Sequence, residues 1–282
     1  MVAHRINKRN IWKGVFQWSV TAVIGLVILF PLYWIFISSI TPQADLFSTP
    51  IDYFPDNVTL ENYVTLFTSL NILGKALNTI IITAIALVAS TISCTLAAYA
   101  FARYSNKLIN TLFTILMFSA MLPGVVTARA LYDYMRSINL IDTYLGLAII
   151  YTSNLITFSV IVLRSYLERV PLSIEESAEI DGANFMQKFF YVVLPLMRPG
   201  IATMCIINFI NCLNDLFTPL YFGLRLETLS VGITTLPRTT QYSTPWNYVS
   251  TMGWFIVFPI ILFVLLFEDK IMDGIMAGGV KQ

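Results

Sequence analysis

The sequence predicts an all-α membrane protein with six transmembrane helices. The chain of 282 residues is 57% hydrophobic and only 12% charged, whereas soluble domains carry about 25% charged residues. The missing charge is concentrated in six stretches without Asp, Glu, Lys or Arg: 14–44, 76–102, 108–128, 143–163, 199–214 and 239–267. About 20 mostly apolar residues cross a bilayer as a helix. Five of the six stretches reach that length. The remaining one, 199–214, reaches it only by continuing past Asp215.

The first apolar stretch follows a basic N-terminal tail, residues 1–13. It is longer than the apolar core of a secretory signal and has no convincing small-residue cleavage site, so we expect a retained helix that ends near Ile40. Residues 41–75 are too polar to span. The second helix, 76–101, is rich in Ala, Ser and Thr, the small residues that let membrane helices pack closely.

The remaining elements follow from the same pattern. We expect a third helix at 109–128, and then a short interfacial helix in 129–142, where apolar and charged residues alternate. The fourth helix is predicted at 143–163, the fifth at about 200–222 and the sixth at about 247–267. Length and apolar composition are the only basis for these boundaries.

The distribution of Lys and Arg predicts the orientation. With six spans, both termini lie on one side, and 12 of the 17 basic residues then fall on the side of the termini. Because basic residues favour the cytoplasmic side, both termini and the polar segment 165–198 are predicted to be cytoplasmic. The domain plan is one membrane domain, 14–268, between the tails 1–13 and 269–282.

The polar segment 165–198, which we call the elbow, is predicted to form two short helices. Pro171 is expected to end the fourth helix, and Ser173 followed by Glu176 has the spacing of a capping box. The first short helix, 174–181, is expected to end at Gly182 with a positive φ.

The second short helix of the elbow is expected to begin after Asn184, with Gln187 at the third helical position. Leu194-Pro195 is expected to turn the chain back into the membrane. Such stiff capping suits a lever that docks into a partner, but it equally suits a stable interfacial loop, and the residues alone leave both interpretations open.

Several classes of function find no support in the composition. The single His4 lies in the basic tail, so no His-based metal site or catalytic triad is possible, and we expect no enzyme activity and no cofactor in this chain. The three cysteines fall inside predicted spans and imply no disulfide framework. A net charge of +1 gives no indication of a nucleic-acid partner.

The elbow resembles the signature loop of the permease subunits of ATP-binding-cassette importers. That family has Glu-Ala-Ala, then Asp-Gly-Ala, and Ile-x-Leu-Pro about ten residues beyond the glycine. The corresponding residues here are Glu176-Ser177-Ala178, Asp181-Gly182-Ala183 and Val192-Val193-Leu194-Pro195. The resemblance implies type I importer architecture, in which this loop contacts an ATPase through Glu176, Ala178, Asp181, Gly182, Ala183, Leu194 and Pro195.

Further segments are similar to one branch of that family, the carbohydrate permeases of the maltose and oligosaccharide type, and to the second of the branch's two permeases. They are Phe30-Pro31-Leu32-Tyr33-Trp34, Glu61-Asn62-Tyr63, Met121-Leu122-Pro123, residues 139–147 and Ala277-Gly278-Gly279-Val280-Lys281. One departure is Leu213-Asn214-Asp215, where the family often has Trp-Asn-Asp/Glu.

The resemblance implies a sugar importer in a bacterial or archaeal cytoplasmic membrane. Its expected partners are a second permease in a heterodimer, two ATPase subunits that bind ATP and Mg, an extracytoplasmic sugar-binding protein and the bilayer. The chain itself has no Gly-x-x-x-x-Gly-Lys-Ser/Thr loop for phosphate. Residues 274–282 are a second candidate contact with the ATPase.

Polar residues in the predicted spans are candidates for the substrate pathway. Asn208, Asn211, Asn214 and Asp215 have the spacing of one helix face in the fifth helix. Asn154 and Phe158 in the fourth helix are weaker candidates. Polar side chains in a span face the bundle interior or a wet cavity, so the stripe predicts either contacts with sugar hydroxyls or hydrogen bonds between helices.

The alternative function is an ion-gradient-driven secondary transporter. Such proteins commonly show inverted repeats and ionisable residues near the midplane. We find no internal repeat, and Asp215 is the only acidic residue in a predicted span.

Overall fold

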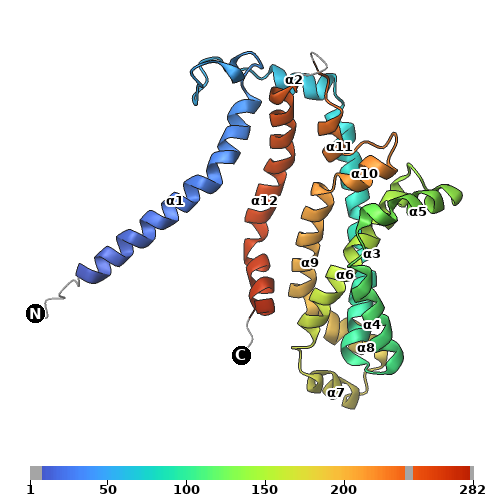
Figure 1. The fold of residues 1–282 in the computed structure, drawn as a ribbon. Coiled ribbons are helices and arrows are strands. Elements are labelled where there is room, and N and C mark those ends of the chain that lie inside the picture. Colours follow the sequence, from blue (N-terminus) through green and yellow to red (C-terminus); the bar gives the residue numbers. More distant parts are fainter. Residues whose placement is uncertain (1–7, 239–243, 280–282) are drawn as a thin grey trace, which may run out of the picture. The chain divides into compact units, whose positions relative to one another are not determined.

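The computed structural model describes residues 8–238 and 244–279, and every regular element in these ranges is a helix (Figure 1). The chain divides into two compact units. One unit comprises Met1–Asn71 with Leu236–Val257, and the other comprises Ile72–Thr235 with Phe258–Gln282. The boundary between the units falls inside the last helix, α12 (Trp246–Gly279).

The first unit contains α1 (Lys8–Ser39), the 3-10 turn Asp45–Phe47, α2 (Glu61–Thr68) and the start of α12. A buried network joins them. Asn62 Nδ2 donates to the carbonyl oxygens of Ser39 at 2.9 Å and Thr41 at 3.1 Å, and Asn247 Nδ2 donates to Asn62 Oδ1 at 2.8 Å. The amides thus satisfy carbonyls that the end of α1 leaves without helical partners.

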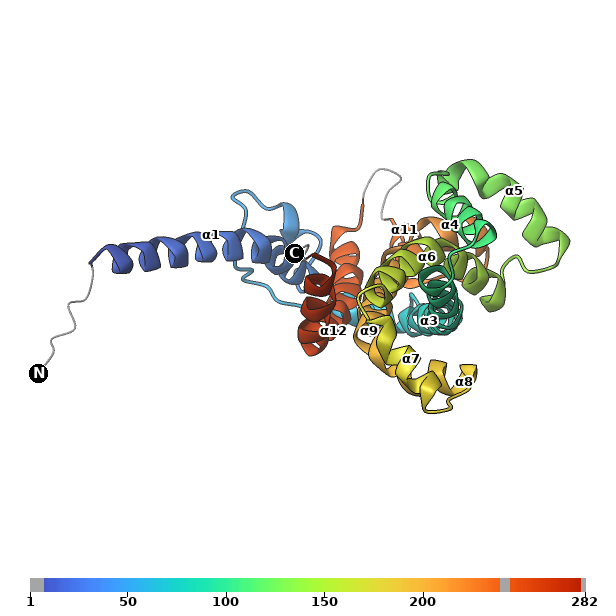
Figure 2. The ribbon, with the colours of Figure 1, turned by 90° about the horizontal axis from the view of Figure 1, so that it is seen from below.

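The second unit is built around three long helices that lie side by side (Figure 2): α3 (Ile72–Arg103), α6 (Tyr144–Leu167) and α9 (Leu194–Asn214). Small residues permit the close approach. A Cβ added to Gly200 of α9 would lie 2.8 Å from the Tyr166 ring of α6, so only glycine fits at this crossing.

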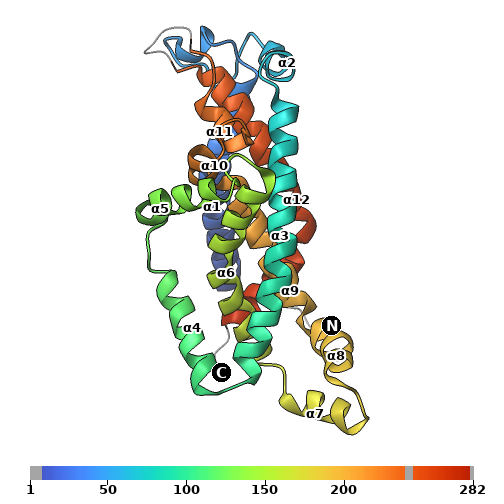
Figure 3. The same ribbon diagram turned by 90° about the vertical axis from the view of Figure 1, so that its right-hand side faces the viewer.

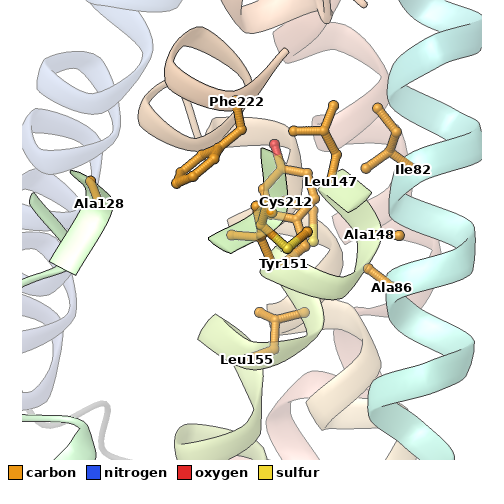
Figure 4. Close-up of a cluster of buried hydrophobic side chains, with 11 residues drawn as sticks. Ile82, Ala86, Ala128, Leu147, Ala148, Tyr151, Leu155, Cys212 and Phe222 are labelled. Atoms are coloured by element: carbon orange, nitrogen blue, oxygen red, sulfur yellow. The ribbon is translucent and has the colours of Figure 1, made fainter. Parts of the chain in front are cut away.

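Two apolar clusters fill this unit. The first joins α3, α6, α9 and the short α10 (Phe217–Phe222), and Figure 4 shows its side chains. Its members include Ile82, Ala86, Leu147, Ala148, Tyr151, Leu155, Cys212 and Phe222. The second cluster lies nearer the end of α3 and includes Cys94, Ala98, Tyr99, Leu163, Leu167, Phe189, Val193 and Met197. All three cysteines are free thiols, and Cys94 and Cys212 are buried.

The helix predicted at 109–128 is not continuous. The segment forms α4 (Lys107–Ser119) and α5 (Gly124–Ser137), which meet at an angle of 104° (Figure 3). Pro123 lies at the break with an extended backbone. The helix breaks there because proline has no N–H to continue the hydrogen-bond ladder. Five helices are long and apolar enough to cross a membrane, or six if this bent pair is one span.

The fifth helix is also shorter than predicted, because α9 ends at Asn214 rather than near residue 222. Asp215 is extended, with ψ 116°, and its Oδ1 accepts the backbone N–H of Thr218 at 3.2 Å. The carboxylate therefore caps the start of α10 instead of continuing α9. A further short helix, α11 (Leu229–Thr234), follows in the segment expected to be a loop.

The C-terminal boundary differs as well. Helix α12 continues to Gly279, so most of the expected tail, 269–282, is helical. Residues 1–7 of the N-terminal tail and 280–282 at the other end lie outside the described residues. The expected ATPase contact of 274–282 therefore stays a prediction.

Candidate functional site

The elbow projects beyond the three long helices at the end of α3 that carries Arg103 (Figure 1). Its first helix, α7 (Leu172–Ile180), begins after Pro171 with no side-chain cap. The predicted capping box of Ser173 and Glu176 is therefore wrong: Ser173 already lies inside the helix, and its carbonyl accepts the Ser177 hydroxyl at 2.8 Å. Helix α6 ends at Leu167, so Pro171 opens α7 rather than ending the preceding helix.

The turn after α7 confirms the prediction for Gly182, whose φ is +86°. The capping box at the start of α8 (Phe185–Lys188) is confirmed as well: Asn184 Oδ1 accepts the Gln187 N–H, and Gln187 Oε1 accepts the Asn184 N–H, both at 2.9 Å. These bonds satisfy two backbone N–H groups at the start of α8 and so define where the second arm begins.

The prediction that the chain turns at Leu194-Pro195 is wrong. Helix α8 continues through the π-helical residues Phe189–Val193 directly into α9. The widened turn lies immediately before Pro195, where the missing N–H interrupts the regular hydrogen-bond ladder. The second arm of the elbow is thus a continuous helical extension of α9.

The tip of the elbow exposes apolar side chains. Ile180, at the end of α7, is 86% exposed, and Met186 of α8 is 59% exposed. Of the residues predicted to contact an ATPase, Glu176, Asp181 and Gly182 are exposed, whereas Ala178, Ala183, Leu194 and Pro195 are half-buried. Exposed apolar side chains close in sequence to exposed carboxylates are a feature of surfaces that bind another protein.

The sequence interpretation missed the residues that hold the elbow. Glu175, adjacent to the motif, is only 2% exposed. Its Oε1 accepts Arg103 Nε at 2.7 Å, and its Oε2 accepts the Tyr99 hydroxyl at 3.0 Å. The one available signal was Arg103, the charge that closes a long uncharged stretch, but its partner is visible only in three dimensions.

The polar stripe of the fifth helix divides into two parts. Asn208 is fully buried, and its Nδ2 donates to Ser159 Oγ of α6 at 2.9 Å. Asn211 and Asn214 are exposed, and Asp215 is half-buried beyond the end of α9. Asn208 therefore holds two helices together, and the exposed amides stay available for other partners.

The two candidates on α6 are exposed too. Asn154 Nδ2 lies 3.5 Å from Thr218 Oγ1 of α10, and Phe158 is 41% exposed. Among the described residues, no group of three or more His, Cys, Asp or Glu side chains is placed to hold a metal ion.

Comparison with known proteins relates this architecture to one family. Residues 94–269 match the family model described as binding-protein-dependent transport system inner membrane component. The trehalose transport system permease protein SugB of Mycobacterium tuberculosis is 30% identical over 94% of this chain and 97% of its own length.

Other relatives cover almost the same length. The sulfoquinovosyl glycerol transport system permease protein SmoH of Agrobacterium fabrum is 29% identical over 90% of this chain and 89% of that protein. The diacetylchitobiose uptake system permease protein DasC of Streptomyces coelicolor is 27% identical over 97% of this chain and 99% of that protein.

A solved structure has the same fold. The crystal structure of a bacterial ABC transporter involved in the import of the acidic polysaccharide alginate contains a chain that matches with a TM-score of 0.77 at 22% identity, covering 93% of this chain and 98% of that chain. With the family model over more than half of the sequence, these matches identify the chain as a member of the family of inner membrane components of binding-protein-dependent transport systems.

Proposed function

We propose that this chain is a permease subunit of an ATP-driven importer that moves a sugar or oligosaccharide into the cytoplasm. The observation that carries the proposal is the elbow: two short helices joined at Gly182, the second closed by a capping box, with Ile180 exposed beside the turn in a member of this transport family. The relatives named for sulfoquinovosyl glycerol, diacetylchitobiose and trehalose support a carbohydrate as the substrate class.

In this proposal the tip of the elbow docks into an ATPase subunit. Glu176 and Asp181 offer exposed carboxylates to the partner, and Ile180 offers apolar surface. The excess of basic residues on the side of the termini supports a cytoplasmic elbow. Hydrolysis of ATP with Mg then takes place on two ATPase subunits, and this chain transmits the resulting movement.

The sugar is proposed to pass along the exposed part of the polar stripe. Asn211, Asn214 and Asn154 supply amide groups for sugar hydroxyls, Asp215 supplies a carboxylate, and the Phe158 ring can lie against the apolar face of a pyranose. Asn208 is assigned to helix packing, because its amide is buried against Ser159. A second permease in a heterodimer would complete the pathway, and an extracytoplasmic binding protein would deliver the sugar.

Purification in mild detergent followed by mass spectrometry of the bound proteins tests this proposal. We expect a P-loop ATPase, a second permease and, with added binding protein, a carbohydrate ligand. Recovery of the intact chain without an ATPase would contradict the proposal. It would return attention to the ion-gradient-driven transporter, which no structural observation favours.

A further inference from the structure

The last two turns of α3 hold the elbow through a buried group of four side chains, Tyr99, Arg103, Glu175 and Lys188, which we call the clamp. Glu175 accepts Arg103 Nε at 2.7 Å and the Tyr99 hydroxyl at 3.0 Å. Arg103 uses a second nitrogen, Nη2, to donate to the carbonyl of Val170 at 3.0 Å. Arg103 thus binds both the segment before α7, through Val170, and the first turn of α7, through Glu175.

The clamp also reaches the second arm of the elbow. Lys188 of α8 forms an ion pair with Glu179 of α7 and lies 3.9 Å from Glu175 Oε2. The ring centroid of Tyr99 lies 5.4 Å from that of Phe189 and 6.0 Å from that of Phe185, both in edge-on geometry. Both arms are therefore attached to α3, whereas the tip at Gly182 has open space around it.

The chemistry of the clamp makes this attachment stiff. Glu175 is 2% exposed and the Arg103 side chain is 10% exposed, so neither charge can move away without being left buried and unpaired. Two cations, Arg103 and Lys188, balance the carboxylates of Glu175 and Glu179. A hinge between the elbow and α3 would therefore have to break these bonds.

We propose that the clamp makes the elbow and α3 move as one body, and that Glu175 and Arg103 are positioning residues that convert displacement of the tip into displacement of the span. This inference rests on the proposed function of the elbow. Loss of the clamp would let the ATPase hydrolyse ATP while the tip moves without α3, so that hydrolysis and uptake become uncoupled.

The test is transport per ATP hydrolysed by the complete importer, with ATPases, second permease and binding protein, reconstituted in liposomes. For Glu175→Gln, which keeps shape but removes the charge, we expect assembly and ATP hydrolysis to persist while uptake per ATP falls about tenfold, within the usual range of coupling effects. The matched control is Glu168→Gln, which removes the exposed ion pair with Arg164 four residues away on α6. It should leave the ratio unchanged.

A second variant, Tyr99→Phe, removes one hydrogen bond to Glu175 and keeps the ring against Phe189. We expect an assembled importer with a smaller fall in the same ratio. If Glu175→Gln fails to assemble, Tyr99→Phe alone tests whether the clamp is needed for coupling. An unchanged ratio in the assembled variants would overturn the inference.

The geometry has its own test. In a background in which Cys94, Cys205 and Cys212 are replaced by alanine, Arg103→Cys and Glu175→Cys can be joined by a short bifunctional thiol reagent. We expect the two substitutions to lower uptake per ATP. Because positions 103 and 175 are proposed to keep a fixed distance during transport, the crosslink should restore it. A crosslink that abolishes the remaining uptake would show that the elbow must move relative to α3, and would overturn the inference.

Failure of the proposed function is distinguishable from failure of the clamp. If the wild-type complex shows no ATP-dependent uptake, the importer proposal itself fails. If the wild type takes up sugar and the clamp variants do so with equal efficiency, only the inference about the clamp fails.

Discussion

At the scale of the residue, Gly182 makes the clearest prediction. Its φ of +86° is strained for other residues, although a Cβ there would meet no atom within 4 Å. Replacement by valine therefore acts through the backbone alone, at about 1–2 kcal/mol for the left-handed conformation. We expect Gly182→Val to lower uptake per ATP in an assembled importer.

The matched control at this position is Gly182→Asn. Asparagine adds a side chain of similar volume but adopts positive φ readily, so it should retain coupling. Normal uptake by the valine variant, or equal loss in both variants, would show that the conformation of this turn is not what the elbow requires.

Gly146 makes a prediction about stability rather than coupling. A Cβ at this position would lie 1.9 Å from the Leu140 carbonyl oxygen, and backbone cannot move aside as a flexible side chain does. We expect Gly146→Ala to destabilise the protein by about 1–3 kcal/mol or more, as overpacking does. The measurement is the thermal midpoint of the purified protein in detergent.

Gly25→Ala serves as the control for Gly146, since Gly25 lies in α1 and a Cβ there meets nothing within 4 Å. Alanine favours helix over glycine by about 1 kcal/mol, so the thermal midpoint should stay equal or rise. An equal fall for both substitutions would contradict the close approach at Gly146.

The residues of the elbow show how far local sequence rules extend. The Asn184 cap and the positive φ of Gly182 were predictable because each depends on neighbours within four residues. The Ser173 cap was mispredicted because Pro171 already starts the helix. Glu175 could not be identified, since its partners Tyr99 and Arg103 lie more than 70 positions away in the chain.

At the scale of the element, α9 carries one asparagine that joins two helices and another that is proposed to line the sugar pathway. Asn208 is buried against Ser159, whereas Asn211 is exposed one turn further along. We expect Asn208→Leu to lower the thermal midpoint through loss of an interhelical hydrogen bond of about 1 kcal/mol. Asn211→Leu should leave that midpoint and the amount of assembled complex unchanged but lower uptake about tenfold.

Each asparagine variant is the control for the other, because both replace an amide by leucine on the same helix. The measurements are thermal midpoint and sugar uptake on the same preparations. Unchanged uptake in Asn211→Leu would assign the exposed part of the stripe to structure as well.

The helices differ in how well hydropathy predicted them. Helices α3, α6 and α12 correspond to long uncharged stretches, and only their ends were displaced. The predicted third helix is bent and the predicted fifth helix ends earlier than expected, because hydropathy measures apolar length and not direction. The bend before α5 depends on Pro123, and the end of α9 depends on the Asp215 cap.

At the scale of the whole molecule, the chain carries apolar helices, a stiffly held elbow and no phosphate-binding loop in its sequence. Membership of the transport family sets the architecture, and in the proposed function energy enters through ATPase partners. In the same proposal exposed side chains of α6 and α9 select the sugar, because a fold by itself does not set the substrate. The sequence therefore predicts the class of transporter better than the identity of its sugar.

Uptake of radiolabelled sugar into liposomes that contain the complete importer tests whether ATP hydrolysis by partner subunits drives sugar import through this chain. We expect accumulation that requires ATP and binding protein and that persists when ionophores collapse the proton and sodium gradients. Uptake that needs no ATP and disappears with the ionophores would contradict it.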